Sequence, residues 1–112
     1  MAERTVPAAR PKGAIPIDGF VGLVNSPVWT DRNKASLALL RLTESRDPEV
    51  LARLRREALA SLVDMARWKS PGHASPGATI LGRMAGLSEE KIAVATTTLE
   101  GRESIVAAAL AR

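Results

Sequence analysis

A seven-residue pattern occurs twice in this chain of 112 residues, and its two copies contain both tryptophans. The first copy is Leu23-Val24-Asn25-Ser26-Pro27-Val28-Trp29, and the second is Leu62-Val63-Asp64-Met65-Ala66-Arg67-Trp68. The second follows the first by 39 residues at both ends. A period of roughly 40 residues is typical of stacked helix pairs. We therefore predict a helical array in which the two tryptophans fill equivalent corners between helices, in core or boundary packing. Exposed contact points for a partner are the alternative for Trp29 and Trp68.

The composition favours helices over strands. Aromatic residues make up 3% of the chain, tyrosine is absent, and the apolar residues are mainly alanine and leucine. Alanine and leucine are strong helix formers, whereas aromatic residues favour strands. A chain of this length has room for one domain with one modest core. We therefore expect an all-α fold.

The residue types also restrict chemistry and location. The chain contains no cysteine, which excludes disulfides, thiolate catalysis and zinc–thiolate sites. No apolar run approaches the ~18 residues that cross a bilayer, and the N-terminus lacks the apolar segment of a secretory signal. We expect a soluble chain without membrane contact, and its localisation stays open.

The net charge is +4, with a pI of about 10.3. Residues 1–16 hold half of this excess, so the rest of the chain is only slightly basic. Because acidic residues are interspersed among the basic ones, a solvated surface of mixed charge is the favoured interpretation. A basic pI is also one element of a nucleic-acid-binding footprint, so that alternative is kept.

Proline and capping residues divide the chain into segments. Residues 1–16 contain three prolines and no periodic apolar pattern, which predicts a flexible arm before a domain at 17–112. Asp47-Pro48 and Ser75-Pro76 each place a capping residue before a proline, the usual start of a helix. The helices are expected at about 17–25, 28–44, 48–68 and 76–85, with a fifth from Ser88 that Gly101 interrupts and a last segment from Ile105.

The apolar pattern predicts which helical faces are covered. Phe20, Val21, Leu23 and Val24 are expected in the core, and the run from Leu37 to Leu42 is apolar enough to be covered on more than one side. In the third helix one face carries core residues at helical spacing. These residues are Leu51, Leu54, Ala58, Leu62 and Met65.

The second expected helix reads Arg32-x-x-Ala35-x-x-Ala38-Leu39-x-x-Leu42, and Ile80–Met84 keeps part of this motif. The motif resembles the second helix of a HEAT repeat, so the chain is identified as similar to HEAT-repeat (armadillo-type) proteins. The resemblance implies a short right-handed α-α superhelix of two to three helix pairs that binds macromolecules through its concave face. It divides the domain into repeats at 17–46 and 47–86 and a partial repeat at 87–112.

Several residues are candidates for function, and each has a structural alternative. Arg53, Arg55, Arg56 and Arg67 form the densest basic cluster and could contact phosphates or an acidic partner. His73, the only histidine, could be a general base oriented by Asp64, but a helix-entry residue is the favoured interpretation. The sequence thus points to no catalytic, cofactor-binding or metal-binding residue.

The sequence therefore predicts a non-enzymatic module, or scaffold, for protein–protein interaction. A nucleic-acid-binding helical domain that uses the arginine-rich surface is the alternative. The last apolar segment, from residue 104 to 112, is no polar cap for an array. We expect it to dimerise or to continue into further repeats.

Overall fold

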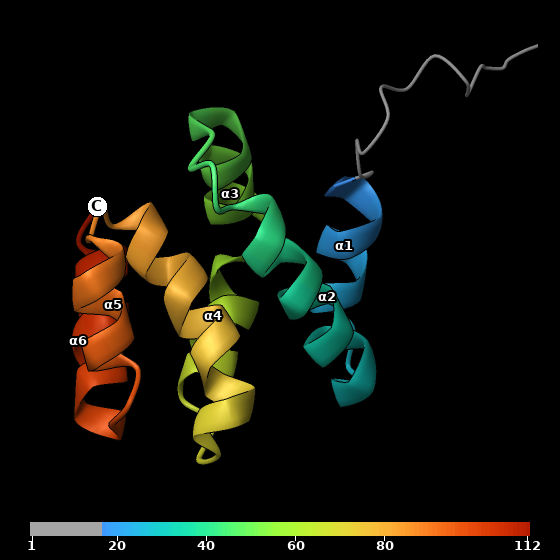
Figure 1. Ribbon diagram of the computed structural model, residues 1–112. Coiled ribbons are helices and arrows are strands. Elements are labelled where there is room, and N and C mark those ends of the chain that lie inside the picture. The colour runs from blue at the N-terminus through green and yellow to red at the C-terminus, as the bar shows by residue number, and fades with distance from the viewer. Residues whose placement is uncertain (1–16) are drawn as a thin grey trace, which may run out of the picture.

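The computed structural model describes residues 17–112, which form six helices and no strand (Figure 1). The prediction of an all-α chain is confirmed for this range. The expected arm, residues 1–16, lies outside the described residues. The helices are α1 (Ile17–Val24), α2 (Trp29–Leu42), α3 (Pro48–Ala66), α4 (Pro71–Met84), α5 (Glu89–Ala95) and α6 (Leu99–Leu110).

Local capping chemistry sets several helix ends. The Asp47 carboxylate accepts a hydrogen bond from the Glu49 backbone N–H at 2.9 Å, and Ser88 caps α5 with its hydroxyl in the same way. Gly86 follows α4 with φ of +79°, in the left-handed region that favours glycine. The predictions that helices start at Asp47 and Ser88 are confirmed.

Helix α4 begins earlier than predicted. It starts at Pro71, with Ser70 before it, so Pro76 lies inside the helix instead of opening it. A proline there removes one backbone hydrogen bond, but Pro76 is buried. The following Gly77 lets α4 approach α3 closely, since a Cβ at this position would lie 3.0 Å from the Met65 Cβ. Tertiary packing therefore offsets the local preference.

The break between α5 and α6 also differs from the prediction. It falls between Ala95 and Leu99, and Gly101 lies in the first turn of α6 instead of interrupting a helix. The Thr98 hydroxyl caps α6 by accepting a hydrogen bond from the Gly101 N–H at 2.9 Å. A Cβ at Gly101 would lie 2.0 Å from the Ala95 carbonyl oxygen. This glycine is needed for the close approach of α5 and α6.

The core lies between the helices and is mostly aliphatic. The predicted core face of α3 is confirmed for Leu54, Ala58, Leu62 and Met65, which are buried, while Leu51 is partly buried and packs against the core. Two other expectations are wrong, because Leu23 is 40% exposed and Leu37 is 55% exposed. The largest completely buried apolar side chains are Leu39, Leu54, Leu62, Met65, Ile80, Leu81 and Ile105.

The first two helix pairs are stacked in the same order. Helix α1 packs against α2, and α3 packs against α4. The first helices of the two pairs, α1 and α3, are also in contact, as are the second helices, α2 and α4. In Figure 1 the chain progresses from α1 at the right to α5 and α6 at the left, and the extents are 51 × 28 × 20 Å.

The third pair is arranged differently. Helix α5 packs against α4 and α6 but has no contact with α3, whereas α6 packs against both α3 and α4. Helix α6, the second helix of this pair, therefore follows α1 and α3 in their row of neighbouring helices, whereas α5 does not. Because the order is reversed, 87–112 does not repeat the packing of the two preceding pairs.

Between residues 17 and 112, no helix has the length and apolar character needed to cross a membrane.

Candidate interaction surface

The two tryptophans are in contact with each other. Trp29 is the first residue of α2, and Trp68 lies in the connection between α3 and α4. Their ring centroids are 4.1 Å apart, with the ring planes tilted by 37°. Both therefore lie at corners between paired helices, but their surroundings are not equivalent. Trp29 is partly buried, whereas Trp68 is 41% exposed, so the prediction of core or boundary packing is wrong for Trp68.

Arg32 holds Trp29 in place. Its guanidinium carbon lies 4.4 Å from the centroid of the Trp29 ring, a cation–π geometry. The same guanidinium donates a hydrogen bond to the Ser61 carbonyl at 3.0 Å and lies 3.9 Å from the Asp64 carboxylate. Arg32 therefore attaches the start of α2 to α3. Because Trp29 is fixed on one side by Arg32, it forms an ordered support for Trp68.

One hollow is lined by Trp68, and a second lies close to it at the start of α4. The first, with a volume of about 450 Å³, is lined by the four residues Arg67–Ser70 and so includes Trp68. The second, of about 200 Å³, is a groove between α2 and α4 and includes the exposed Leu37. The two hollows lie close to each other, since Ser70 lines the first, Gly72 lines the second, and a Cβ at Gly72 would lie 4.0 Å from the Ser70 Oγ. We call them together the Trp68 surface; the groove is lined by Asn33, Ser36, Leu37, Gly72, His73 and Pro76.

The residues that line the Trp68 surface include the cations Arg67 and Lys69 and no carboxylate, while Glu103 and Asp64 lie close to Arg67 outside the lining. No acidic residue occurs between Asp64 and Glu89, a stretch that contains all of α4. Lys69 is exposed and makes no ion pair within residues 17–112. Arg67 is bound by Glu103, with a distance of 2.8 Å from its Nε to the carboxylate. The hydrogen bond from Arg67 to Glu103 raises the pKa of Arg67 above its ordinary value.

Of the four arginines in the predicted cluster, only Arg53 and Arg56 are brought together, where both line a hollow of about 410 Å³ beside Ile17. Arg53 pairs with Asp18 of α1 and, at 3.1 Å, with Glu57. Arg55 donates to the Ala109 carbonyl at 2.7 Å, at the end of α6. Arg56 is exposed and makes no side-chain hydrogen bond with the described residues, and Arg67 pairs with α6 as above. Three of the four guanidinium groups thus bind other parts of the chain.

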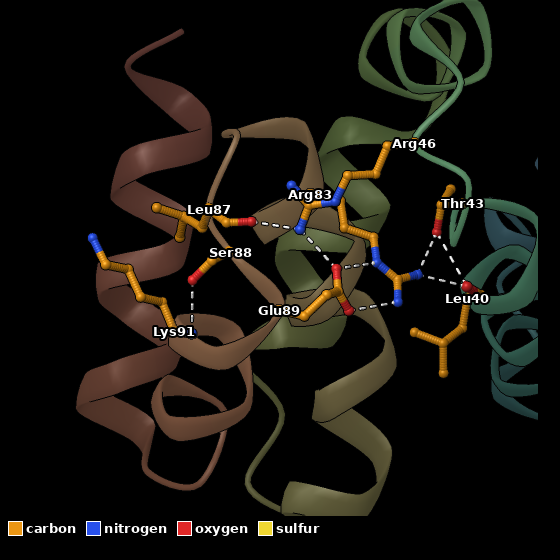
Figure 2. A network of polar contacts seen from close by, with 8 residues as sticks. All are labelled: Leu40, Thr43, Arg46, Arg83, Leu87, Ser88, Glu89 and Lys91. Carbon is orange, nitrogen blue, oxygen red and sulfur yellow. Dashed lines mark hydrogen bonds and ion pairs between the residues drawn. The ribbon is translucent and has the colours of Figure 1, made fainter.

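The most extensive polar network is centred on Arg83, which is 6% exposed (Figure 2). Its guanidinium forms a bidentate pair with Glu89 at 3.0 and 2.9 Å. On its other side it donates to the Leu40 carbonyl at 2.6 Å and to the Thr43 hydroxyl at 2.8 Å. The network joins the end of α2 to α4 and to the start of α5. The sequence patterns did not predict this network; an arginine within the apolar run Ile80–Met84 is the signal that could have revealed it.

Arg46 completes this network. It pairs with the same Glu89 carboxylate at 2.7 Å and donates to the Leu87 carbonyl (Figure 2). Hydrogen bonds from Arg83 and then Arg46 lower the pKa of Glu89 to about 2. None of the described hollows opens onto Glu89. The geometry therefore indicates a structural clamp.

Arg102 is a second buried arginine, and it binds carbonyl groups only. It is 2% exposed and donates to the Ala66 carbonyl at 3.2 Å and to the Thr96 carbonyl at 2.8 Å. These carbonyls lie at the ends of α3 and α5. No signal in the sequence distinguishes this residue from an exposed arginine, because its neighbours Glu100, Glu103 and Ser104 are polar.

His73 is exposed in the first turn of α4, on the edge of the groove. Its side chain makes no hydrogen bond with the described residues, and Asp64 faces Arg32. No group of three or more His, Asp or Glu within residues 17–112 is placed to hold a metal ion. The structure thus places His73 as a helix-entry residue.

Comparisons of the chain with protein-family models, with curated proteins and with solved structures found no match.

Proposed function

We propose that this protein is a non-enzymatic protein–protein interaction module built from HEAT-like helix pairs. The main observation in support is the Trp68 surface. There the exposed Trp68 packs against Trp29 and lines a pocket that lies close to a groove. Tryptophan is enriched at the energetic centres of protein interfaces, where it fills a desolvated pocket. The stacking of α1–α2 on α3–α4 in one order supports the HEAT-like interpretation for these two pairs.

The engaged arginines make nucleic-acid binding the weaker proposal. Binding of a phosphate backbone needs several cations that are free to neutralise it. Arg53 and Arg67 already pair with carboxylates, and Arg55 binds a helix end. Arg53 binds α1, whereas Arg55 and Arg67 bind α6, so these guanidinium groups are held within the fold and form no continuous basic track.

A site-specific crosslink tests the proposed function. A photoreactive residue at Leu37, exposed in the groove, is expected to give a discrete adduct with a protein in cells that make the full chain. The control is the same photoreactive residue at Glu100, which is exposed on α6. Adducts that are equal at both positions, or an adduct with nucleic acid at Leu37, contradict the proposal.

A further inference from the structure

We infer that the Trp68 surface binds an acidic segment of a partner protein that inserts an apolar side chain beside Trp68. This inference rests on the proposed function and adds the chemistry of the partner. It follows from two independent features of the surface, its shape around Trp68 and its charge.

The shape provides a place for an apolar anchor. The pocket of about 450 Å³ at Arg67–Ser70 is larger than a single apolar side chain and is bordered by the exposed part of the Trp68 ring. Because Trp68 lies against Trp29, and Trp29 lies against Arg32, the ring is ordered before a partner arrives. An ordered aromatic anchor loses little conformational entropy on binding.

The charge selects for acidic residues beside that anchor. Lys69 and Arg67 line the pocket, and no acidic residue lines either hollow. Helix α4 begins at this point with no acidic residue in its first turn, so the positive end of its dipole is not neutralised by its own side chains. Arg67 is paired with Glu103 and also interacts with the charge of Asp64, so Lys69 and the start of α4 are the positive groups here that no carboxylate of residues 17–112 pairs with.

The number of cations favours an acidic peptide over a nucleic acid. A protein that tracks a phosphate backbone commonly makes about 6–10 phosphate contacts. Only two cationic side chains line the pocket, and one of them is already paired. Two or three carboxylates beside one apolar residue match this charge better than a nucleic-acid strand does.

Tryptophan fluorescence of the full chain can measure the binding, since Trp68 lines the surface and Trp29, the only other tryptophan, is in contact with Trp68. The probes are short synthetic peptides in which one leucine or phenylalanine is flanked by glutamates, and matched peptides with lysines in place of the glutamates. A single-stranded oligonucleotide is the third probe. We expect saturable binding of a glutamate peptide only. Binding of the lysine peptides or of the oligonucleotide, or no binding of any peptide, overturns the inference.

Charge reversal at Lys69 assigns the binding to this surface. Lys69→Glu is expected to weaken glutamate-peptide binding by roughly fivefold at low ionic strength, with a smaller effect in high salt. The control Lys91→Glu changes the same charge on α5 and is expected to bind as the unmodified protein does. Equal affinities of the two variants contradict the inference. If Leu37 still crosslinks to a protein while every acidic peptide fails, the inference fails and the proposed function stands.

Discussion

Arginine side chains close the ends of helices in this molecule. The last carbonyl groups of a helix have no partner within it, and the helix dipole makes them negative. A guanidinium offers five N–H donors in a planar fork, so one arginine can bind two carbonyls or a carbonyl and a carboxylate. Twelve of the 16 basic residues are arginines. The arginines that bind carbonyls at or just beyond helix ends are Arg46, Arg55, Arg83, Arg102 and Arg112.

The first prediction concerns Arg102. Replacement by leucine removes both hydrogen bonds and leaves the Ala66 and Thr96 carbonyls without this donor. Each buried group that loses its partner costs about 1–3 kcal/mol, so we expect Arg102→Leu to lower the free energy of unfolding by about 3 kcal/mol. Urea denaturation measures the change. The control Arg56→Leu alters an exposed arginine and is expected to change stability by less than about 0.5 kcal/mol. Equal losses of stability in the two variants would show that the hydrogen bonds of Arg102 to the two carbonyls do not stabilise the fold.

The second prediction concerns pH. The pKa of Glu89 is about 2 in the folded protein, below its ordinary value of 4.5, so the charged form is favoured by folding. The stabilisation is therefore complete above about pH 5 and is lost as the pH falls toward 2. The stability difference between the unmodified protein and Glu89→Gln should shrink over this range in urea denaturation. Glu90→Gln, at the exposed neighbouring position, should show no such pH dependence. A difference that stays constant from pH 7 to pH 2 contradicts the role of the Arg83–Glu89 pair.

At the scale of helices, the sequence predicts correctly the helix starts that depend on a capping residue. It does not predict the helix boundaries that depend on tertiary contacts. Asp47 and Ser88 act within one turn of the chain, so local pattern suffices. Pro76 lies within α4 because it is buried there, and Gly101 is required because the backbone of α5 at Ala95 lies so close to it. The same limit applies to the candidate surface. The duplicated motif located both tryptophans, but only folding shows that they touch.

The third prediction concerns Gly101, where α5 and α6 approach each other closely. In Gly101→Ala the new Cβ would lie 2.0 Å from the Ala95 carbonyl oxygen, so the backbones must separate. Overpacking of this kind costs about 1–3 kcal/mol, even though alanine is the better helix former. The control is Gly22→Ala in α1, where a Cβ meets nothing within 4 Å. There we expect a gain of about 0.5–1 kcal/mol. Thermal unfolding of the two variants should thus shift in opposite directions.

At the scale of the whole molecule, α4 is the element on which the others depend. It packs against α2, α3, α5 and α6, whereas α1 packs only against α2 and α3. Arg83 of α4 also binds the end of α2 and the start of α5. The reversed order of the third pair follows from this arrangement, because α5 and α6 both contact α4. The molecule is therefore a short stack around a central helix, and its candidate interaction surface lies where that helix begins.

This arrangement predicts how the molecule opens locally. Helices with many packed neighbours exchange their amide hydrogens only through global unfolding, whereas elements at an edge open with a smaller free energy. We expect the amides in the middle of α4 to exchange most slowly and those of α1 to exchange faster. Hydrogen exchange followed by NMR or mass spectrometry measures both. The two helices differ in length, so the comparison uses hydrogen-bonded amides away from the first and last turns. If α1 exchanges as slowly as α4, the array unfolds as one unit and α4 has no special role.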